Sequence, residues 1–535
     1  MSGTSEAEET SMAEARTFYV TTAIDYVNSA PHLGTAYEKI AADVIARLRR
    51  LEGYQTFFLM GNDEHSQNVA KAAESQGKKP LEYCDEMATV FRRTWERLEI
   101  SYDDFIRTTE PRHKRAVDAL FTAIHAAGDI YKGTYSGFYC VSCEAFYPEK
   151  ELLDGKCKIH LREPEWLTED NYFFRLSAYG DRLREHILAN PSFIMPDTRR
   201  NEILALLDSG LQDISISRAG GTWGIPLPID ADHTVYVWFD ALINYLSGIG
   251  YPDSTDARAA HWPASLHVIG KDITRFHCVI WPAMLMAAGL PLPASVFGHG
   301  WVSFRGQKLS KSLGNIVDPL EAADRLGPDA LRYFLIREIP FGKDGEFSWE
   351  LFIERYNSDL ANDLGNLVMR SLSMAKRYLD GQVPRVQAGQ ETAKETAFGA
   401  DVNKCIDAYR TASTELALHD CARSAIEVVR RANRYVEETA PWSRIKEQEG
   451  KVRVGVVLAS LLEAIRIVAV LISPMMPRKS REIWSLLGLP GEPAQMDLTT
   501  LAFDPGFEDR AVADARPLFP RIEVAEPSAA DAAST

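Results

Sequence analysis

The sequence lacks the features that mark several common protein classes. Its 535 residues carry 59 Lys and Arg against 75 Asp and Glu, a formal net charge of −16. This balance excludes a protein that coats nucleic acid indiscriminately, because such binding depends on basic side chains that displace counterions from phosphates. The first 15 residues have neither the basic start nor the apolar run of a signal peptide. We therefore expect a cytoplasmic protein that meets any RNA partner through local basic and aromatic patches.

Long apolar runs and cysteines are also scarce. The longest apolar stretch, Val454 to Ile472, is interrupted by Glu463 and Arg466, which favours a buried bundle helix over a membrane span. We therefore expect no association with a membrane. The 7 cysteines of this long chain are too scattered for a disulfide framework. Buried thiols are expected at Cys84, Cys278, Cys405 and Cys421.

The apolar residues follow an alternation of strand and helix patterns before about residue 351. Strands are expected at 17–23, 56–60, 234–238, 266–269 and near Val296, and the first helix at 36–51. The alternation predicts an α/β fold with a doubly wound, parallel sheet of the Rossmann type. The later residues have the pattern of long amphipathic helices, which predicts an all-α bundle.

The changes of pattern also suggest domain boundaries. The Rossmann-type domain is expected in two halves separated by an insertion with short strands, Gly and Pro turns and a cysteine cluster. A connecting region and the helical domain follow, and composition predicts disorder at both ends. In chain order the segments are 1–16 (disordered), 17–130 (first half), 131–230 (insertion), 231–325 (second half), 326–360 (connection), 361–520 (helical domain) and 521–535 (disordered).

Two short motifs suit a nucleoside triphosphate. The first, PHLGT at 31–35, lies where the first strand gives way to the first helix, the place where ligands bind in an open α/β sheet. Gly34 lets a phosphate approach the backbone, and His32 can donate to a phosphate oxygen as charge builds up. Alone, a His-x-Gly at a turn is more often structural. A Walker-type lysine loop is missing from the sequence, which excludes a P-loop ATPase.

The second motif is KLSKS at 308–312, in a stretch flanked by glycines. Two lysines three residues apart on a mobile loop can close over a triphosphate and neutralise its charge as it leaves. A solvated basic turn is the commoner use of such a run. The presence of both motifs at opposite ends of one α/β domain favours the nucleotide site.

Together the motifs closely resemble the HIGH and KMSKS signatures of class I aminoacyl-tRNA synthetases, and the resemblance extends over residues 17–487. It implies that His32 and Gly34 contact ATP, which binds with Mg²⁺. It also implies that Lys308 and Lys311 stabilise the α-phosphate as the amino acid carboxylate attacks. Thr35 stands where the second signature histidine usually falls, and its hydroxyl can still donate one hydrogen bond. The ATP site would further include Ser310, His299 and Gly300.

Four segments narrow the resemblance to the methionyl-tRNA synthetase family: 23–26 (AIDY), 61–65 (GNDEH), 237–245 (VWFDALINY) and 270–277 (GKDITRFH). It implies that Asp63 holds the ammonium group of methionine. Aromatic and aliphatic walls with a weak polar contact to sulfur suit a flexible thioether, although each aromatic alone is as readily a core residue. The pocket implied consists of Ile24, Tyr26, Trp238, Ala241, Leu242, Tyr245, Ile273 and His277.

A metal site is predicted by Cys140-x-x-Cys143 and Cys157-x-x-His160. Tetrahedral Zn²⁺ takes four nitrogen or sulfur donors, and an x-x spacer turns two of them inward from one tight loop. A redox Cys-x-x-Cys pair would leave the second half of the pattern unexplained. We expect one closed structural zinc site per chain, and the resemblance implies that it lies close to the acceptor end of tRNA.

Two features of the helical part suit unpaired RNA bases. Asn366 and Arg370 lie four residues apart on one helix face, and Trp442 offers an indole at a helix boundary. Unpaired bases are read by stacking and by hydrogen bonds to their edges, while helix packing is the ordinary role of each residue. The resemblance implies that these residues face the anticodon of tRNA(Met). Since only a short tail follows the bundle, a monomer is expected.

These features predict a ligase that activates L-methionine with ATP, releases pyrophosphate and transfers methionine to the 3′ end of tRNA(Met). One alternative is a class I synthetase for leucine, valine or cysteine, against which the short insertion and the segment 237–245 argue. Another is a synthetase-like RNA-binding protein without activity, which the intact signature residues make improbable. The third is a zinc-ribbon scaffold whose nucleotide site is incidental.

Overall fold

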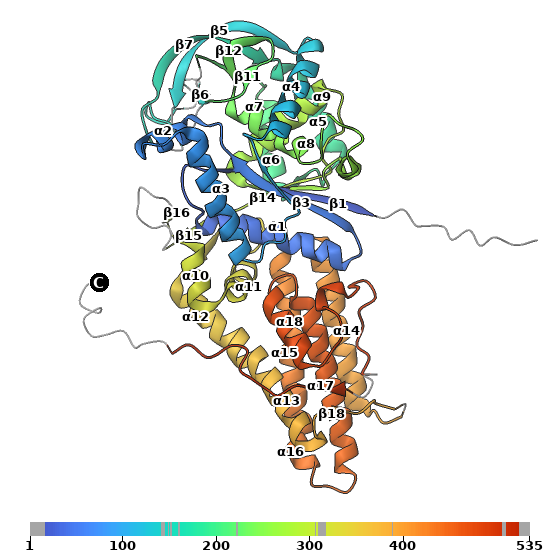
Figure 1. Cartoon of the computed structure of the whole chain (residues 1–535). Helices are drawn as coiled ribbons and strands as arrows, with labels where there is room; N and C mark the ends of the chain where they lie inside the picture. The colour runs from blue at the N-terminus through green and yellow to red at the C-terminus, as the bar shows by residue number, and fades with distance from the viewer. Residues whose placement is uncertain are drawn as a thin grey trace, which may run out of the picture.

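A parallel sheet lies at the centre of the α/β half of the chain (Figure 1). The structure is a computed structural model that describes residues 16–140, 145–147, 149, 152–158, 161–220, 223–304, 307–308, 317–387, 389–505 and 510–523. The strand order is β2-β3-β1-β13-β14-β8, with β4 paired to β3, and all of these pairs are parallel. The strands are β1 (Thr17–Thr22), β2 (Asp25–Tyr26), β3 (Gln55–Asp63), β4 (Asp104–Arg107), β8 (Ile194–Met195), β13 (Leu266–Gly270) and β14 (Val296–His299).

Alternate side chains of the central strands enter two separate cores. Val20 and Phe58 pack into one core with α1 and α3, whereas Tyr19 and Phe57 pack into the other with α4, α7 and α9. Because successive residues of a strand point to opposite faces, helices cover both faces of the sheet. The predicted doubly wound sheet is confirmed. The covering helices are α1 (Leu33–Leu51), α3 (Pro80–Arg97), α4 (Pro111–Ala126), α7 (Val237–Leu242) and α9 (Trp281–Ala287), with α2 (Gln67–Ser75) and α8 (Asn244–Ser247) nearby.

Antiparallel strands form a second layer above the central sheet. One sheet has the order β6-β5-β7-β9 and another the order β10-β12-β11. The strands are β5 (Ile130–Cys140), β6 (Ala145–Tyr147), β7 (Glu165–Phe174), β9 (Ile214–Ser215), β10 (Ser217–Ala219), β11 (Pro226–Leu227) and β12 (Asp230–Val235). Helices η2 (Leu176–Tyr179), α5 (Gly180–Ala189) and α6 (Asp197–Asp208) belong to the same stretch of chain.

Two sequence-based expectations need correction in this layer. The strand expected at 234–238 in the parallel sheet is wrong, because β12 pairs antiparallel with β10 and β11 and the chain turns into α7 at Val237. A β-branched and aromatic run fits either sheet, so its composition could not separate them. The segment 131–230 is also not an insertion throughout, since β8 pairs with β14 in the central sheet.

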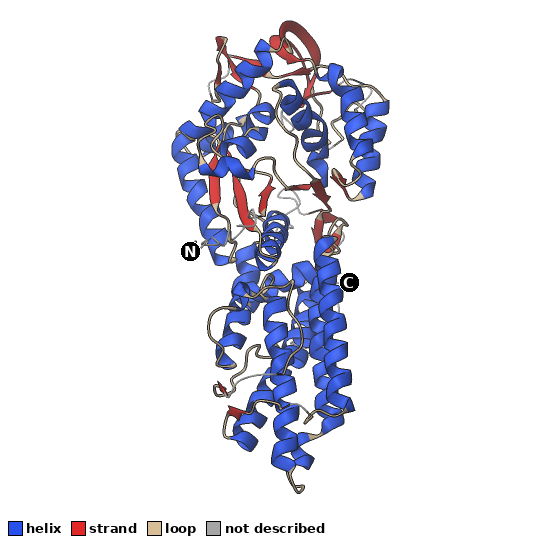
Figure 2. Cartoon of the chain, turned by 90° about the vertical axis from the view of Figure 1, so that its right-hand side faces the viewer, coloured by secondary structure: helices blue, strands red, loops and turns tan. Residues whose placement is uncertain are grey.

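The second half of the chain is helical (Figure 2). Its longest apolar helix, α17, meets the length and composition of a membrane span, yet 94% of its most apolar window is buried inside the protein, as expected for a bundle helix. The helices are α10 (Pro319–Leu326), α11 (Pro328–Glu338), α12 (Trp349–Arg355), the π-helical η7 (Tyr356–Gly365), α13 (Asn366–Leu379), α14 (Ala393–Thr414), α15 (Leu418–Thr439), α16 (Pro441–Arg444), α17 (Gly450–Ile472) and α18 (Pro477–Leu486). Short strands accompany them at β15 (Val302–Phe304), β16 (Gln307–Lys308), β17 (Gly345–Phe347), β18 (Gln382–Val383) and β19 (Arg510–Ala511).

One buried arginine joins the two halves. Arg332 of α11 is fully buried, and its guanidinium donates to the carboxylate of Asp43 on α1 at 2.6 Å. It also donates to the carbonyl oxygens of Pro474 and Met475, between α17 and α18, at 2.7 and 2.9 Å. The helix that starts at the PHLGT motif is thereby tied to the far end of the bundle's core helix.

Candidate active site

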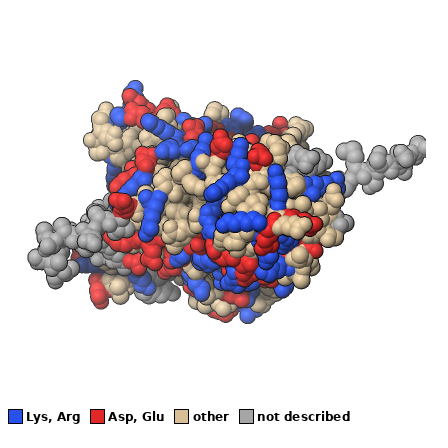
Figure 3. All heavy atoms as spheres, turned by 90° about the horizontal axis from the view of Figure 1, so that it is seen from below, with Lys and Arg blue, Asp and Glu red and all other residues tan. Residues whose placement is uncertain are grey.

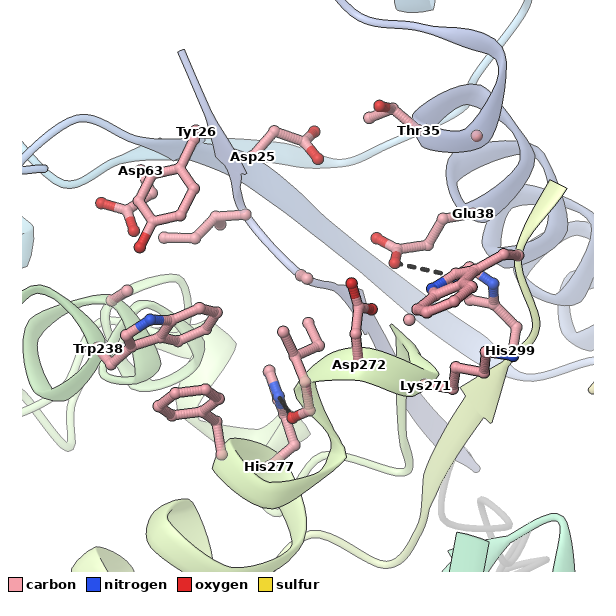
Figure 4. Close-up of a pocket in the computed structure, with 18 of the residues that line it drawn as sticks. Asp25, Tyr26, Thr35, Glu38, Asp63, Trp238, Lys271, Asp272, His277 and His299 are labelled. Carbon is pink, nitrogen blue, oxygen red and sulfur yellow. Dashed lines mark hydrogen bonds and ion pairs between the residues drawn. The ribbon is translucent and has the colours of Figure 1, made fainter. Parts of the chain in front are cut away.

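A cavity of about 1040 Å³ opens at the carboxyl ends of the central strands. The chain that leaves β1 lines it through residues 23–26, and Asp63, Gly270 and His299 line it from the ends of β3, β13 and β14. This is where open α/β sheets bind their ligands. Figure 4 shows two ends, with Tyr26, Asp63 and Trp238 at one and Thr35, Glu38 and His299 at the other.

His32 caps the helix that faces the second of these ends. Its Nδ1 accepts a hydrogen bond from the backbone N–H of Thr35 at 3.2 Å. A neutral ring used in this way carries its proton on Nε2. His32 and Thr35 both line the cavity, so an imidazole N–H, a hydroxyl and the start of helix α1 gather there. Such groups suit the oxygens of a phosphate.

Buried charges lie beneath the same end. Lys39 is fully buried and donates to Asp25, Glu38 and the carbonyl of Ala23, at 2.9, 2.8 and 2.9 Å. Glu38 also pairs with His299 at 3.0 Å. Burial raises the pKa of Asp25 to about 6 although Lys39 opposes it. Burial would raise the pKa of Glu38 as well, but Lys39 and His299 lower it to about 2. The two carboxyl groups therefore titrate in different pH ranges.

Aromatic rings form the wall of the other end. The rings of Trp238 and Phe276 are stacked with centroids 3.9 Å apart and an interplanar angle of 13°, and the edge of Tyr26 meets Trp238 at 6.1 Å. Asp63 is only 3% exposed and borders the cavity beside these rings. An apolar slot next to a buried carboxylate suits a ligand with an apolar side chain and a cationic group.

His277 is held in a defined tautomer at this wall. Its Nδ1 donates to the carbonyl of Ile273 at 3.0 Å, so its Nε2 accepts from the hydroxyl of Tyr245 at 2.7 Å. Burial lowers the pKa of His277 to about 4, and the ring is therefore neutral near pH 7. The pair offers polar atoms to the cavity without adding a charge.

Most of the residues singled out in the sequence lie around this one cavity. Lys308 lies in β16, which pairs with β15 beside the cavity. Ser310 and Lys311 lie outside the described residues. The lining includes Ile24, Tyr26, His32, Gly34, Thr35, Asp63, Trp238, Ala241, Leu242, Tyr245, Ile273, His277, His299 and Gly300.

Several lining residues were missed by the sequence analysis. Glu38 borders the cavity, and its neighbour Lys39 organises it; the signal was a pair of adjacent charged residues among apolar ones near the start of α1. Lys271 and Asp272 also line the cavity and lay within the quoted segment 270–277. Their side-chain direction depends on the turn after β13, which the residue pattern does not specify.

The described part of the zinc motif consists of Cys140 and Cys157. Both are buried, at 2% and 1% exposure, which suits donors of a closed structural site. Cys143 and His160 lie outside the described residues. Tyr147, between the two halves of this motif, and Lys158, within its second half, line the cavity, so the second layer reaches the candidate active site. The four other cysteines are buried as predicted.

The residues predicted to read RNA lie on the bundle surface. Trp442 is 37% exposed, and the guanidinium of Arg370 lies 5.7 Å from its ring centroid while pairing with Glu437 at 2.7 Å. Asn366 is exposed one helical turn earlier. Figure 3 views the molecule from this end and shows basic side chains intermixed with acidic ones.

Two family descriptions match most of the chain. "tRNA synthetases class I (M)" matches residues 18–159 and 149–372, and "Anticodon binding domain of methionyl tRNA ligase" matches residues 383–519. The Rossmann-type sheet, its cavity and these matches define the class: the chain is a class I aminoacyl-tRNA synthetase.

Individual relatives show to which family of class I synthetases the chain belongs. The chain is 47% identical to methionine–tRNA ligase of Brucella suis over 89% of its length and 93% of the relative. It is 45% identical to methionine–tRNA ligase of Nostoc sp. over 95% of its own length and 98% of that relative. A structure of Mycobacterium tuberculosis methionyl-tRNA synthetase in complex with methionyl-adenylate superimposes with a TM-score of 0.90 at 44% identity, covering 95% of this chain and 100% of that one. The chain belongs to the methionine–tRNA ligase family.

Proposed function

We propose that the cavity binds methionine and ATP side by side, and that the chain joins them before it esterifies tRNA(Met). The observation that carries this assignment is the division of one cavity into an aromatic, carboxylate-bearing end and a helix-capped end. Residues from distant parts of the chain supply the two ends, and they are the residues that the family resemblance names.

At the aromatic end, Asp63 pairs with the ammonium group of methionine. The thioether lies among aromatic and aliphatic side chains, where a polarisable sulfur gains contacts with rings. The neutral pair of Tyr245 and His277 provides the weak polar contact. The side-chain site consists of Ile24, Tyr26, Trp238, Ala241, Leu242, Tyr245, Ile273 and His277.

At the helix-capped end, ATP binds against His32, Gly34 and Thr35, with His299 and Gly300 at the adjoining strand end. A carboxylate oxygen of methionine attacks the α-phosphorus, and the bond to the bridging oxygen of pyrophosphate breaks. His32 donates from Nε2 to the phosphate oxygens as charge builds up, and Lys308, Ser310 and Lys311 complete the phosphate site. Mg²⁺ that accompanies ATP neutralises part of this charge.

The second reaction transfers methionine to tRNA. A hydroxyl of the 3′-terminal ribose attacks the carbonyl carbon of the adenylate, and AMP leaves. Asn366, Arg370 and Trp442 bind the anticodon at the bundle, far from the reacting atoms. Cys140, Cys143, Cys157 and His160 hold one structural Zn²⁺, which fixes the second layer beside the cavity.

The test is ATP–pyrophosphate exchange with methionine, leucine, valine and cysteine, followed by charging of tRNA transcripts with a CAU or an altered anticodon. Exchange with methionine alone, charging of the CAU transcript and about one zinc per chain on the same sample are expected. Exchange with another amino acid would replace the substrate assignment. If a zinc-free sample of unchanged stability still catalyses exchange, the metal does not have a structural role.

A further inference from the structure

A fully buried carboxylate, Asp240, lies behind the methionine end of the cavity. It accepts from Nδ1 of His65 at 2.8 Å and from Nε2 of His113 at 2.5 Å, and neither Asp240 nor His65 lines the cavity. We propose that Asp240 is a positioning residue for methionine binding. It acts by locking the strand end that carries Asp63 against the helix that carries Trp238. This inference rests on the proposed function of the cavity.

Asp240 joins two walls of the pocket. It lies on α7, two residues after Trp238 and one before Ala241, which both line the cavity. Its partner His65 lies two residues after Asp63, just beyond β3. The hydrogen bond between His65 and Asp240 therefore links the strand end that carries the Asp63 carboxylate to the helix that carries the aromatic wall.

The neighbouring residue Glu64 is bonded to elements other than α7. Glu64 points away, is fully buried and pairs with Arg107 at 2.7 Å, and its backbone N–H donates to the hydroxyl of Thr108 at 2.9 Å. Its carbonyl accepts from the indole of Trp223 at 2.6 Å. These bonds fix the backbone beside Asp63, whereas the bond from His65 sets its distance from the helix.

Asp240 has a second partner in His113. Nε2 of His113 lies 2.5 Å from the carboxylate of Asp240, and its Nδ1 lies 2.9 Å from the hydroxyl oxygen of Ser247. Burial alone would raise the pKa of Asp240, but His65 and His113 lower it to about 2.

The two histidines have separable tasks. His113 comes from α4 and is hydrogen-bonded to Asp240, so its loss leaves a buried carboxylate without one of its two partners and lowers stability. His65 is attached to the strand end of Asp63, so its loss frees that end from α7. A displacement of a binding group by about 1 Å lowers rates by up to two orders of magnitude. The effect should fall on methionine and spare ATP, which binds at the opposite end.

The experiment compares His65→Gln and Asp240→Asn with Asp359→Asn. Asp359 is an equally buried carboxylate, bonded to Tyr333 at 2.7 Å, but it lies in the bundle and serves as the matched control. In ATP–pyrophosphate exchange we expect the KM for methionine to rise at least tenfold in the first two variants, with the KM for ATP within twofold of wild type. The control should lower the melting temperature without raising the KM for methionine.

Equal rises of both KM values, or a similar rise in the control, would make Asp240 a purely structural residue and overturn the inference. Where Asp240→Asn fails to fold, His65→Gln carries the test, because the amide of Gln places no donor at the position of Nδ1, which bonds Asp240. An unchanged KM for methionine in a folded His65→Gln enzyme refutes the link. If the wild-type enzyme shows no exchange with methionine, the proposed function fails instead, independently of these variants.

Discussion

The cavity and the part of the bundle surface that we propose to bind the anticodon are built in opposite ways. In the cavity, the side chains of Asp63 and His277 are nearly inaccessible, and His277 is held by hydrogen bonds to Ile273 and Tyr245 before any ligand arrives. On the bundle, Trp442 is 37% exposed and Arg370 already pairs with Glu437, so binding must exchange existing contacts. A fixed interior suits two small ligands that must meet at an exact geometry, whereas an adaptable surface suits unpaired bases.

The largest effect is expected where the two regions join. Arg332→Met removes a buried donor from Asp43 and from the carbonyl groups of Leu98, Pro474 and Met475, and loss of one partner of such a pair costs about 3 to 5 kcal/mol. We expect the unfolding free energy to fall by this amount and thermal unfolding to separate into two transitions. Calorimetry measures both.

A surface ion pair provides the control for this junction. Arg97→Met removes the pair of Arg97 with Asp324, whose side chains are 39% and 65% exposed, and such pairs contribute about 0 to 1 kcal/mol. If the Arg332 variant loses no more stability than this control, the two regions are held together by other contacts.

Within the cavity, Asp63→Ala should remove the partner of the substrate ammonium. A lost partner of a buried charge pair costs about 3 kcal/mol, or on the order of 100-fold in kcat/KM for methionine. ATP binding should change little, because Asp63 lies at the far end from Thr35 and Glu38 in Figure 4. Exchange kinetics at varied methionine and varied ATP separate the two constants. A variant that loses ATP affinity instead would place the ammonium elsewhere.

On the bundle, Trp442→Ala should act only when tRNA is present. Stacking of a base on an aromatic ring contributes about 1 to 3 kcal/mol, so kcat/KM for tRNA should fall at least about fivefold while exchange with methionine stays near wild type. A parallel fall of both reactions would show that the ring stabilises the bundle, and the division of labour between the two regions would be lost.

The sequence predicted the ends of the central strands well and the links between them poorly. Strand and helix periodicity located β1, α1, β13 and β14. The PHLGT motif marked His32, and the family resemblance marked Asp63. The placement of β12 and the role of Lys39 depend on partners far along the chain. Likewise, Asp240 stood within a quoted segment, but its meaning comes from His65 and His113 on other elements.

The smallest expected effect contrasts a carboxyl group of the cavity with one of the bundle. Burial raises the pKa of Asp25 to about 6, so the folded protein binds its proton more tightly than the unfolded chain does. The stability that this proton contributes is fully present below about pH 4 and is lost as the pH rises through 6. Burial alone would also raise the pKa of Glu395, but Arg453 and other donors lower it to about 2. Its contribution is present above about pH 4.5 and is lost as the pH falls toward 2.

Substitution by amides, which cannot titrate, makes this contrast measurable. The melting temperature of Asp25→Asn relative to wild type should increase between pH 4 and 7, since only the wild type loses stability there. For Glu395→Gln the deficit relative to wild type should be constant above pH 5 and shrink as the pH falls below it. If the melting-temperature difference between variant and wild type changes with pH in the same direction for both variants, the buried carboxyl group of the cavity behaves like that of the bundle. Lys39 would then fully compensate the burial of Asp25.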